Sequence, residues 1–264
     1  PEWSPYNFVF NNPLKFIDPD GMAPLTDYKL LQNGQVQRID SNDGSQNRSD
    51  DRLFATDSKG NVNNVDPITV KKASPESDSI IGELSIATSY LGRLRPIKDG
   101  TVSAGYTNSA NVAAKVFNFL NSNTKEGIEF GLGRFLRNGS SENYLITTQH
   151  SIDTNTNGFN YMTKYIGGYD NLISFYHNHD GPTSNPNTYG TQWGNEYGGD
   201  QSTRITVTNF VTKNSYMIPR FLTVHGDFGN SVIEFTRFGH RNTGLTLTPS
   251  TLKSINKIHY YNVK

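Results

Sequence analysis

The sequence contains no cysteine, no excess of charge of either sign and no long apolar run. Without cysteine, disulfides, thiolate zinc sites and cysteine nucleophiles are excluded, and any bound metal ion needs His, Asp or Glu ligands. The 24 basic and 24 acidic side chains cancel, which argues against a dedicated nucleic-acid-binding protein. No segment approaches the roughly 18–20 apolar residues of a membrane span. We therefore expect neither a nucleic-acid partner nor a membrane-spanning helix.

The chain is rich in aromatic residues set in a polar background. Phe and Tyr occur 15 and 14 times, although hydrophobic residues make up only 34% of the 264 residues. This mixture is typical of turn-rich β structure with aromatic packing, and the length suggests one or two domains. The chain begins at Pro1 without a signal-like segment, so we interpret it as a fragment of a longer protein.

The first 24 residues form a distinct segment, in which apolar residues alternate as in a short strand between turn signals. The string YNFVFNNPL at 6–14, followed by DPDGM at 18–22, resembles the end of the Rhs/YD-repeat core that precedes polymorphic bacterial toxin domains. The resemblance implies that an effector follows, and that Asp18 and Asp20 contribute to a self-cleavage element as paired carboxylates. From the residues alone, both aspartates can equally be turn formers.

Residues 25–100 are predicted to be a polar linker with minor β structure. Gln, Asn, Asp and Ser dominate 32–51, where apolar residues are too few to offset the entropy of ordering the chain. Leu53–Thr56 and Ile68–Val70, with a turn between them, predict a small hairpin. No catalytic constellation is visible in this region.

Residues 101–264 have the pattern of a compact α+β domain with one main sheet. Apolar residues from Val112 to Leu120 form a single helical stripe, and Ser109 or Asn108 can cap the helix. Strands are expected after the helix, with a hairpin turn at Asn138-Gly139. The expected strands are 128–136, 144–148, 172–179, 217–225 and 232–238.

His177 and His179 carry the sharpest local signal. Residues two apart on a strand point to the same side, so both imidazoles could bind one metal ion, although a structural pair of histidines is the alternative. A long polar loop follows and ends in Gly198-Gly199-Asp200, a setting that suits a functional residue. Upstream, Glu129 shares its predicted strand face with glycines, which would leave space for a ligand.

Together these residues resemble the JAB/JAMM (MPN+) metal-dependent peptidases, and more closely the JAB-like toxins attached to Rhs proteins. The family pattern is a Glu on a strand after a helix, then His-x-His, then an Asp after a loop. The corresponding residues are Glu129, His177 with His179, and Asp200. Over roughly 105–245, the resemblance implies a mixed sheet flanked by helices. It also implies Zn²⁺ held by the two histidines and the aspartate, with Glu129 as general base.

Alternatives stay open at two of these positions, and the loop departs from the family pattern. Glu126 is the alternative general base, and Asp180 is the alternative third ligand. The gap between the second histidine and the aspartate is longer than in the family. The family serine three residues before the aspartate is replaced by Tyr197, so Tyr197, Thr183 or Ser184 is expected to stabilise the oxyanion. After the aspartate the resemblance implies a helix, although ITVT is β-branched.

The resemblance implies a zinc-dependent peptidase or isopeptidase toxin of an Rhs-type effector, secreted by a type VI or related route and delivered into a target cell. The implied partners are a cognate immunity protein, the upstream Rhs shell or secretion tip, and an unidentified protein substrate. A nuclease toxin and a metal-free JAB-like binding module are the competing hypotheses. The balanced charge weighs against the nuclease, because phosphate binding requires a cationic surface.

Overall fold

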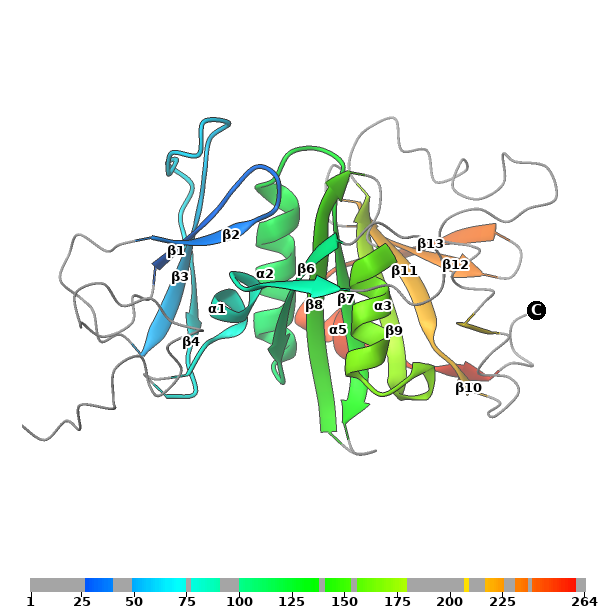
Figure 1. The fold of residues 1–264 in the computed structure, drawn as a ribbon. Helices are drawn as coiled ribbons and strands as arrows, with labels where there is room; N and C mark the ends of the chain where they lie inside the picture. The colour runs from blue at the N-terminus through cyan, green and yellow to red at the C-terminus, as the bar shows by residue number, and fades with distance from the viewer. Residues whose placement is uncertain are drawn as a thin grey trace, which may run out of the picture.

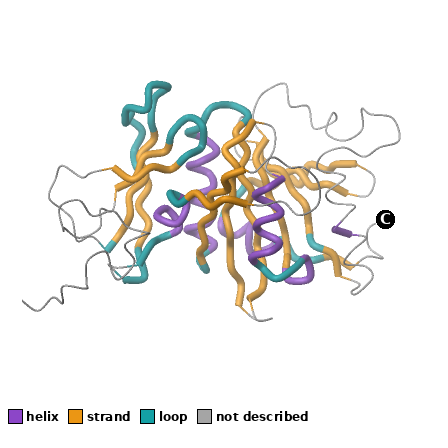
Figure 2. The backbone as a smooth tube through the Cα atoms, in the orientation of Figure 1, coloured by secondary structure: helices purple, strands orange, loops and turns teal. Residues whose placement is uncertain are grey.

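The computed structural model describes residues 27–39, 49–74, 77–90, 100–137, 141–152, 156–179, 207–208, 217–225, 231–236 and 239–259. Within these ranges the chain forms an eight-stranded sheet, a four-stranded sheet and a two-stranded pair, with helices packed beside them (Figure 1). None of the helices in this part of the chain is long and apolar enough to span a membrane. Figure 2 shows how strongly strands predominate.

The eight-stranded sheet forms the centre of the fold. Its strands are β5 (Ala87–Tyr90), β6 (Gly100–Thr107), β7 (Ile128–Arg137), β8 (Ser141–Ile152), β9 (Leu172–His179), β11 (Arg220–His225), β12 (Ser231–Thr236) and β13 (Gly239–Thr246). They lie in the order β13-β12-β11-β9-β7-β8-β6-β5. β9 and β11 are parallel and all other neighbours are antiparallel, so the sheet is mixed, as expected.

The predicted strands are confirmed within the described residues, with one division and one extension, and positions 237–238 of the last one lie outside the description. The expected strand 217–225 is split at Pro219, which has no N–H to donate to a ladder. The preceding piece, β10 (Met217–Ile218), pairs instead with β14 (Ile258–His259). β8 is longer than predicted at both ends, and the turn expected at Asn138-Gly139 lies between described residues.

The predicted helix is α2 (Ala110–Ser122), and Ser109 is its N-cap, accepting a hydrogen bond from Val112 N. It lies on one face of the main sheet with α1 (Ile80–Leu84) and α5 (Pro249–Ser254), and their apolar side chains join one core cluster. The opposite face is covered by α3 (Thr156–Tyr165), whose Phe159 and Met162 belong to a second cluster. Figure 1 shows α2 and α3 on opposite sides of the strands.

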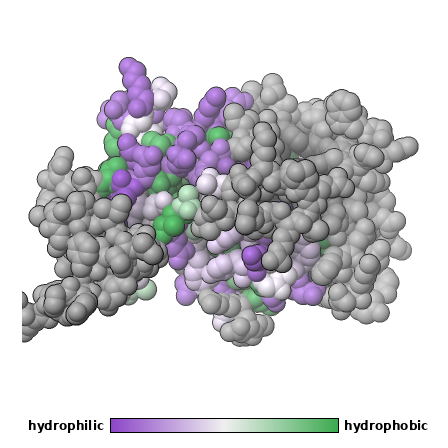
Figure 3. Space-filling view, in the orientation of Figure 1, coloured by the Kyte–Doolittle hydropathy of each residue, from purple (hydrophilic) through white to green (hydrophobic). Residues whose placement is uncertain are grey.

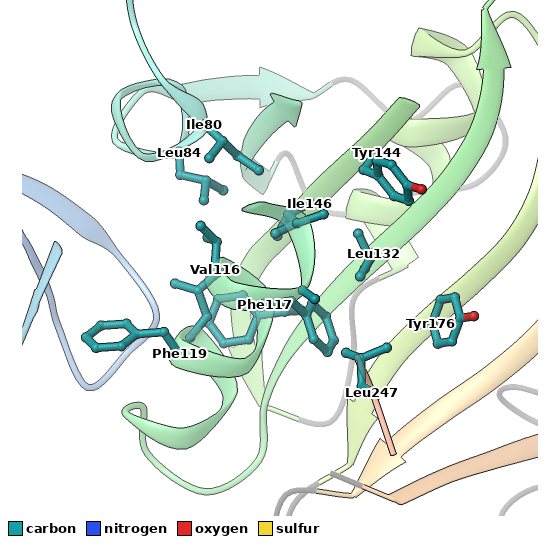
Figure 4. Packing of buried hydrophobic residues seen from close by; sticks show 14 of the residues in the cluster. Ile80, Leu84, Val116, Phe117, Phe119, Leu132, Tyr144, Ile146, Tyr176 and Leu247 are labelled. Atoms are coloured by element: carbon teal, nitrogen blue, oxygen red, sulfur yellow. The ribbon is translucent and has the colours of Figure 1, made fainter. Parts of the chain in front are cut away.

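The first core cluster is built from alternate residues of the sheet and the buried stripe of α2. Leu132, Ile146 and Tyr176 are each 0% exposed and face Phe117 of α2 (Figure 4). Fully burying such a side chain contributes about 1.5–3 kcal/mol, so this layer fixes which strand face points toward α2. The neighbouring residues of each strand must then point toward α3.

The segment 25–100 contains more regular structure than the sequence predicts. β1 (Asp27–Leu30), β2 (Val36–Ile39), β3 (Asp50–Ala55) and β4 (Ile68–Lys71) form the four-stranded sheet in the order β2-β1-β3-β4. The expected hairpin is the antiparallel pair of β3 and β4, and β1 runs parallel to β3. Hydrophilic side chains predominate on the loop that projects from this sheet (Figure 3), although Val62 and Val65 are exposed there as well. Both expected domain boundaries, at 24 and at 100, adjoin segments outside the description and stay predictions.

The small sheet packs directly onto the main domain. Leu30 and Leu53 are 0% exposed and belong to the same core cluster as α2. Lys125 N donates to Gln32 O at 2.8 Å, just before β7 begins. Gly34 has φ +81°, and a Cβ there would lie 2.8 Å from Ile128 Cγ2. The turn between β1 and β2 therefore needs glycine both for its conformation and for this close contact.

Candidate functional site

β7 and β9 are adjacent antiparallel strands, and their backbone pairing brings the two strongest sequence motifs together. Gly131 is the partner of His177 in this ladder. This is the last pair of the ladder, and Glu129 and His179 lie just beyond it on their respective strands. The general base and the histidine pair expected from the sequence thus occupy neighbouring strands at the same end of the main sheet.

Glu129 and His177 project from the same face of that sheet. Ile128 and Phe130, on either side of Glu129, both belong to the cluster facing α2, so Glu129 points to the opposite face. Tyr176 belongs to the α2 cluster as well, which turns His177 the same way as Glu129. This arrangement confirms the alternation predicted for the strand 128–136.

His177 is buried, with 6% of its surface exposed. Its ring stacks on that of Phe175, with centroids 5.7 Å apart and an interplanar angle of 22°. On the other side of β9, the parallel strand β11 places Thr223 beside it. Burial and the ring contact with Phe175 restrict the orientations open to the imidazole.

The pairing of β7 with β8 is irregular at Glu129. Between Ile128 and Phe130 the β7–β8 register shifts, because Ile128 pairs with Ile152 whereas Phe130 pairs with Thr148. Glu129 is half-buried, and its carbonyl accepts a hydrogen bond from Thr148 Oγ1 at 2.9 Å. The alternative base, Glu126, is exposed in the turn before the strand.

Residues 105–205 match the family model described as JAB-like toxin 1. The chain thus contains a JAB-like toxin domain. The matched segment spans the strands and helices from β6 to β9 and contains Glu129, His177, His179 and Asp200. No curated protein and no solved structure matches the chain significantly.

Several predicted site residues of the JAB-like toxin domain lie outside the described part of the chain. For His179 the structure gives the backbone, as the last residue of β9, and not the side chain. The predicted third ligand Asp200 and its alternative Asp180 lie fully outside the description. The same holds for the oxyanion candidates Thr183, Ser184 and Tyr197 and for the self-cleavage pair Asp18 and Asp20. Among the described residues, no group of three or more His, Asp or Glu side chains could hold a metal ion. The proposed ligand set is therefore only partly placed.

One of the glycines that share a strand face with Glu129 does not leave open space beside the sheet. A Cβ on Gly133 would lie 2.2 Å from Met162 Sδ, so the α3 side chain occupies that position. The prediction that glycines of β7 leave room for a ligand is wrong for Gly133, because a helix of the domain packs there. The helix expected after Asp200 is supported by Val207 and Thr208, which are helical and buried.

Two further histidines acquire neighbours that the sequence does not reveal. In the parallel pair of β9 and β11, His225 is the backbone partner of His179. His150 lies on the α2 side of the sheet, where its Nε2 is 3.0 Å from Ser103 Oγ. His150 adopts φ +56°, unusual for a residue other than glycine, within the stretch of β8 where the register shifts. Burial lowers the pKa of its imidazole.

Proposed function

We propose that the chain is a zinc-dependent peptidase or isopeptidase toxin, with Glu129 as general base and His177, His179 and Asp200 as metal ligands. The observation that carries this proposal is the placement of Glu129 and His177 on one face of neighbouring strands, inside the segment that matches the JAB-like toxin family. The donor set fits zinc, because two imidazoles and one carboxylate leave a fourth position for water.

The proposed reaction divides its tasks between the metal and the protein. When bound, zinc would supply Lewis acidity toward the scissile carbonyl oxygen and toward a water molecule. Glu129 accepts a proton from that water as the water oxygen bonds to the carbonyl carbon, and delivers it to the amine nitrogen as the C–N bond breaks. Tyr197, Thr183 and Ser184 are the proposed hydrogen-bond donors to the oxyanion. Glu129 is preferred to Glu126 because only Glu129 lies on the strand face of His177.

The biological setting of this proposal is that of a delivered toxin. The N-terminal resemblance to an Rhs core supports an effector that is secreted, by a type VI or related route, and enters a target cell. Asp18 and Asp20 would then belong to the self-cleavage element of the Rhs shell. A cognate immunity protein and a protein substrate in the target cell complete the proposed set of partners.

The test combines metal content with growth inhibition in bacteria that express the chain. Purified protein is expected to hold about one zinc per chain by elemental analysis. His177→Ala should lose both zinc and growth inhibition, whereas Glu129→Gln should retain zinc and lose inhibition. Glu126→Gln, a change of the same chemistry three residues earlier, is the matched control and should retain both.

Three outcomes would contradict the proposal. A Glu129→Gln variant that inhibits growth as strongly as the unmodified chain would remove Glu129 from the reaction. A zinc-free chain that binds a partner tightly would instead support the metal-free binding module. Degraded plasmid or RNA in the inhibited cells would point to a nuclease.

A further inference from the structure

Regular strand pairing is interrupted on both sides of Glu129, and buried side chains bind the backbone there. On the β8 side, Ile128 and Phe130 are two residues apart whereas their partners Ile152 and Thr148 are four apart, so the regular ladder lapses between them. On the β9 side, the ladder ends with Gly131 opposite His177. Position 129 therefore falls where strand pairing alone fixes the backbone least.

Asn178 compensates for this lapse. Phe130 N donates to Asn178 Oδ1 at 2.6 Å, and Asn178 Nδ2 donates to Ile128 O at 2.8 Å. One side-chain amide thus binds the backbone directly before and directly after Glu129. Asn178 is only 1% exposed, so water competes little for either hydrogen bond.

Thr148 completes the support from the other neighbouring strand. Its hydroxyl donates to Glu129 O at 2.9 Å and accepts from His150 N at 3.1 Å. Thr148 is likewise 1% exposed. The two peptide units that flank Glu129 are therefore bound from β8 and from β9 by buried side chains.

Asn178 is also the residue between the two histidines of the His-x-His motif. Its side chain points to the α2 face, while His177 points to the face of Glu129. Beyond the last paired residues of the β7–β9 ladder, Asn178 thus joins the strand of the two histidines to the backbone around the proposed base. These buried hydrogen bonds help to fix the position of Glu129 relative to His177.

We propose that Asn178, supported by Thr148, is a positioning residue that fixes the backbone of Glu129 relative to His177. This inference rests on the proposed function for its catalytic consequence, since Glu129 is the base only under that proposal. Misplacement of a catalytic group by about 1 Å can cost about 100-fold in rate. We call the hydrogen bonds from Asn178 and Thr148 to the backbone around Glu129 the clamp. Its loss should impair the reaction while leaving both histidines in place.

The test compares Asn178→Ala with Asn143→Ala. Asn143 is another buried asparagine of the same sheet, 2% exposed, which accepts a hydrogen bond from Tyr106 Oη and donates one to Ser141 O, near the far end of β8. Asn178→Ala should bind zinc with unchanged stoichiometry, lose about tenfold or more of its growth inhibition, and show faster hydrogen exchange at the Phe130 amide. Asn143→Ala should lower the melting temperature by about as much as Asn178→Ala does. It should keep both growth inhibition and the slow hydrogen exchange of the Phe130 amide.

Thr148→Val serves as a second variant because valine has the shape of threonine and removes only the hydroxyl. It should fold, bind zinc and lose part of the growth inhibition. The proposal is overturned if Asn178→Ala and Thr148→Val both keep full inhibition, or if Asn143→Ala loses as much as Asn178→Ala. Failure of the proposed function is seen separately, as full inhibition by Glu129→Gln. In that case unchanged exchange at the Phe130 amide in Asn178→Ala would still refute the clamp.

Discussion

Replacing Gly34 by alanine tests how tightly the small sheet is joined to the strand of Glu129. At φ +81° a Cβ costs about 1–2 kcal/mol, of which about 0.4–1 kcal/mol is offset by the stiffer unfolded chain. The new Cβ would also lie 2.8 Å from Ile128 Cγ2 and 3.2 Å from Phe130 Cζ. Overpacking of this kind adds about 1–3 kcal/mol. The expected total is about 2–4 kcal/mol of lost unfolding free energy.

The assay is thermal unfolding of the purified chain, with Gly244→Ala as the matched control. Gly244 has φ +70°, and a Cβ there would meet nothing within 4 Å, so only the backbone cost of about 1 kcal/mol applies. At about 2–4 °C per kcal/mol for a chain of this size, Gly34→Ala should lower the melting temperature by roughly 5–15 °C. The control should lower it by roughly 2–4 °C. Equal losses in the two variants would refute the close packing of the turn against β7.

Two further stability predictions concern buried ionisable groups. Arg134→Met removes the donor to two backbone carbonyls at and just after α5 and should cost about 2–4 kcal/mol in urea unfolding. Glu142→Gln changes the ion-pair partner of Arg134, whose side chain is 41% exposed, so it should cost less than about 1 kcal/mol of unfolding free energy. A larger loss would contradict a mainly backbone role for Arg134. Burial lowers the pKa of His150 below 6.5, so the unfolded chain takes up a proton before the folded protein does. Stability should therefore fall as pH drops below about 6.5, and His150→Asn, measured between about pH 7.5 and pH 5.5, should flatten that fall.

The geometry between Glu129 and His177 follows largely from two-residue periodicity. In β7, Ile128, Phe130 and Leu132 share the α2 face, and in β9 Tyr176 lies on that face while Phe175 lies on the other. Once that face is fixed, the polar residues must point the other way. The antiparallel register that aligns the two strands is tertiary, and the sequence predicts it only through the family resemblance.

The features that the sequence does not predict arise from contacts between distant segments. Asn178 reads as the variable centre of a His-x-His motif, and its role emerges only when the backbone of Ile128 and Phe130 lies beside it. The β9–β11 pairing, which brings His225 next to His179, is parallel and joins strands far apart in the sequence, so no local turn signals it. The sequence predicts only the β3–β4 hairpin of the small sheet. The parallel pairing of Asp27–Leu30 with β3 joins strands more than twenty residues apart, whereas its antiparallel pairing with β2 is local and crosses a turn containing Asn33-Gly34.

The family match begins at residue 105, yet the contacts around Glu129 begin earlier in the chain. The turn containing Gln32 and Gly34 binds the loop before β7 and packs on Ile128 and Phe130, the two residues that flank the proposed base. Those two side chains are 3% and 0% exposed, so removing the small sheet would bare apolar surface at the point where the β7 ladder is already irregular. Asn178 and Thr148 bind the same peptide units through hydrogen bonds from within the main sheet. The small sheet and the main sheet therefore act on one short stretch of backbone, and the unit that must fold to hold Glu129 in place extends upstream of the family match.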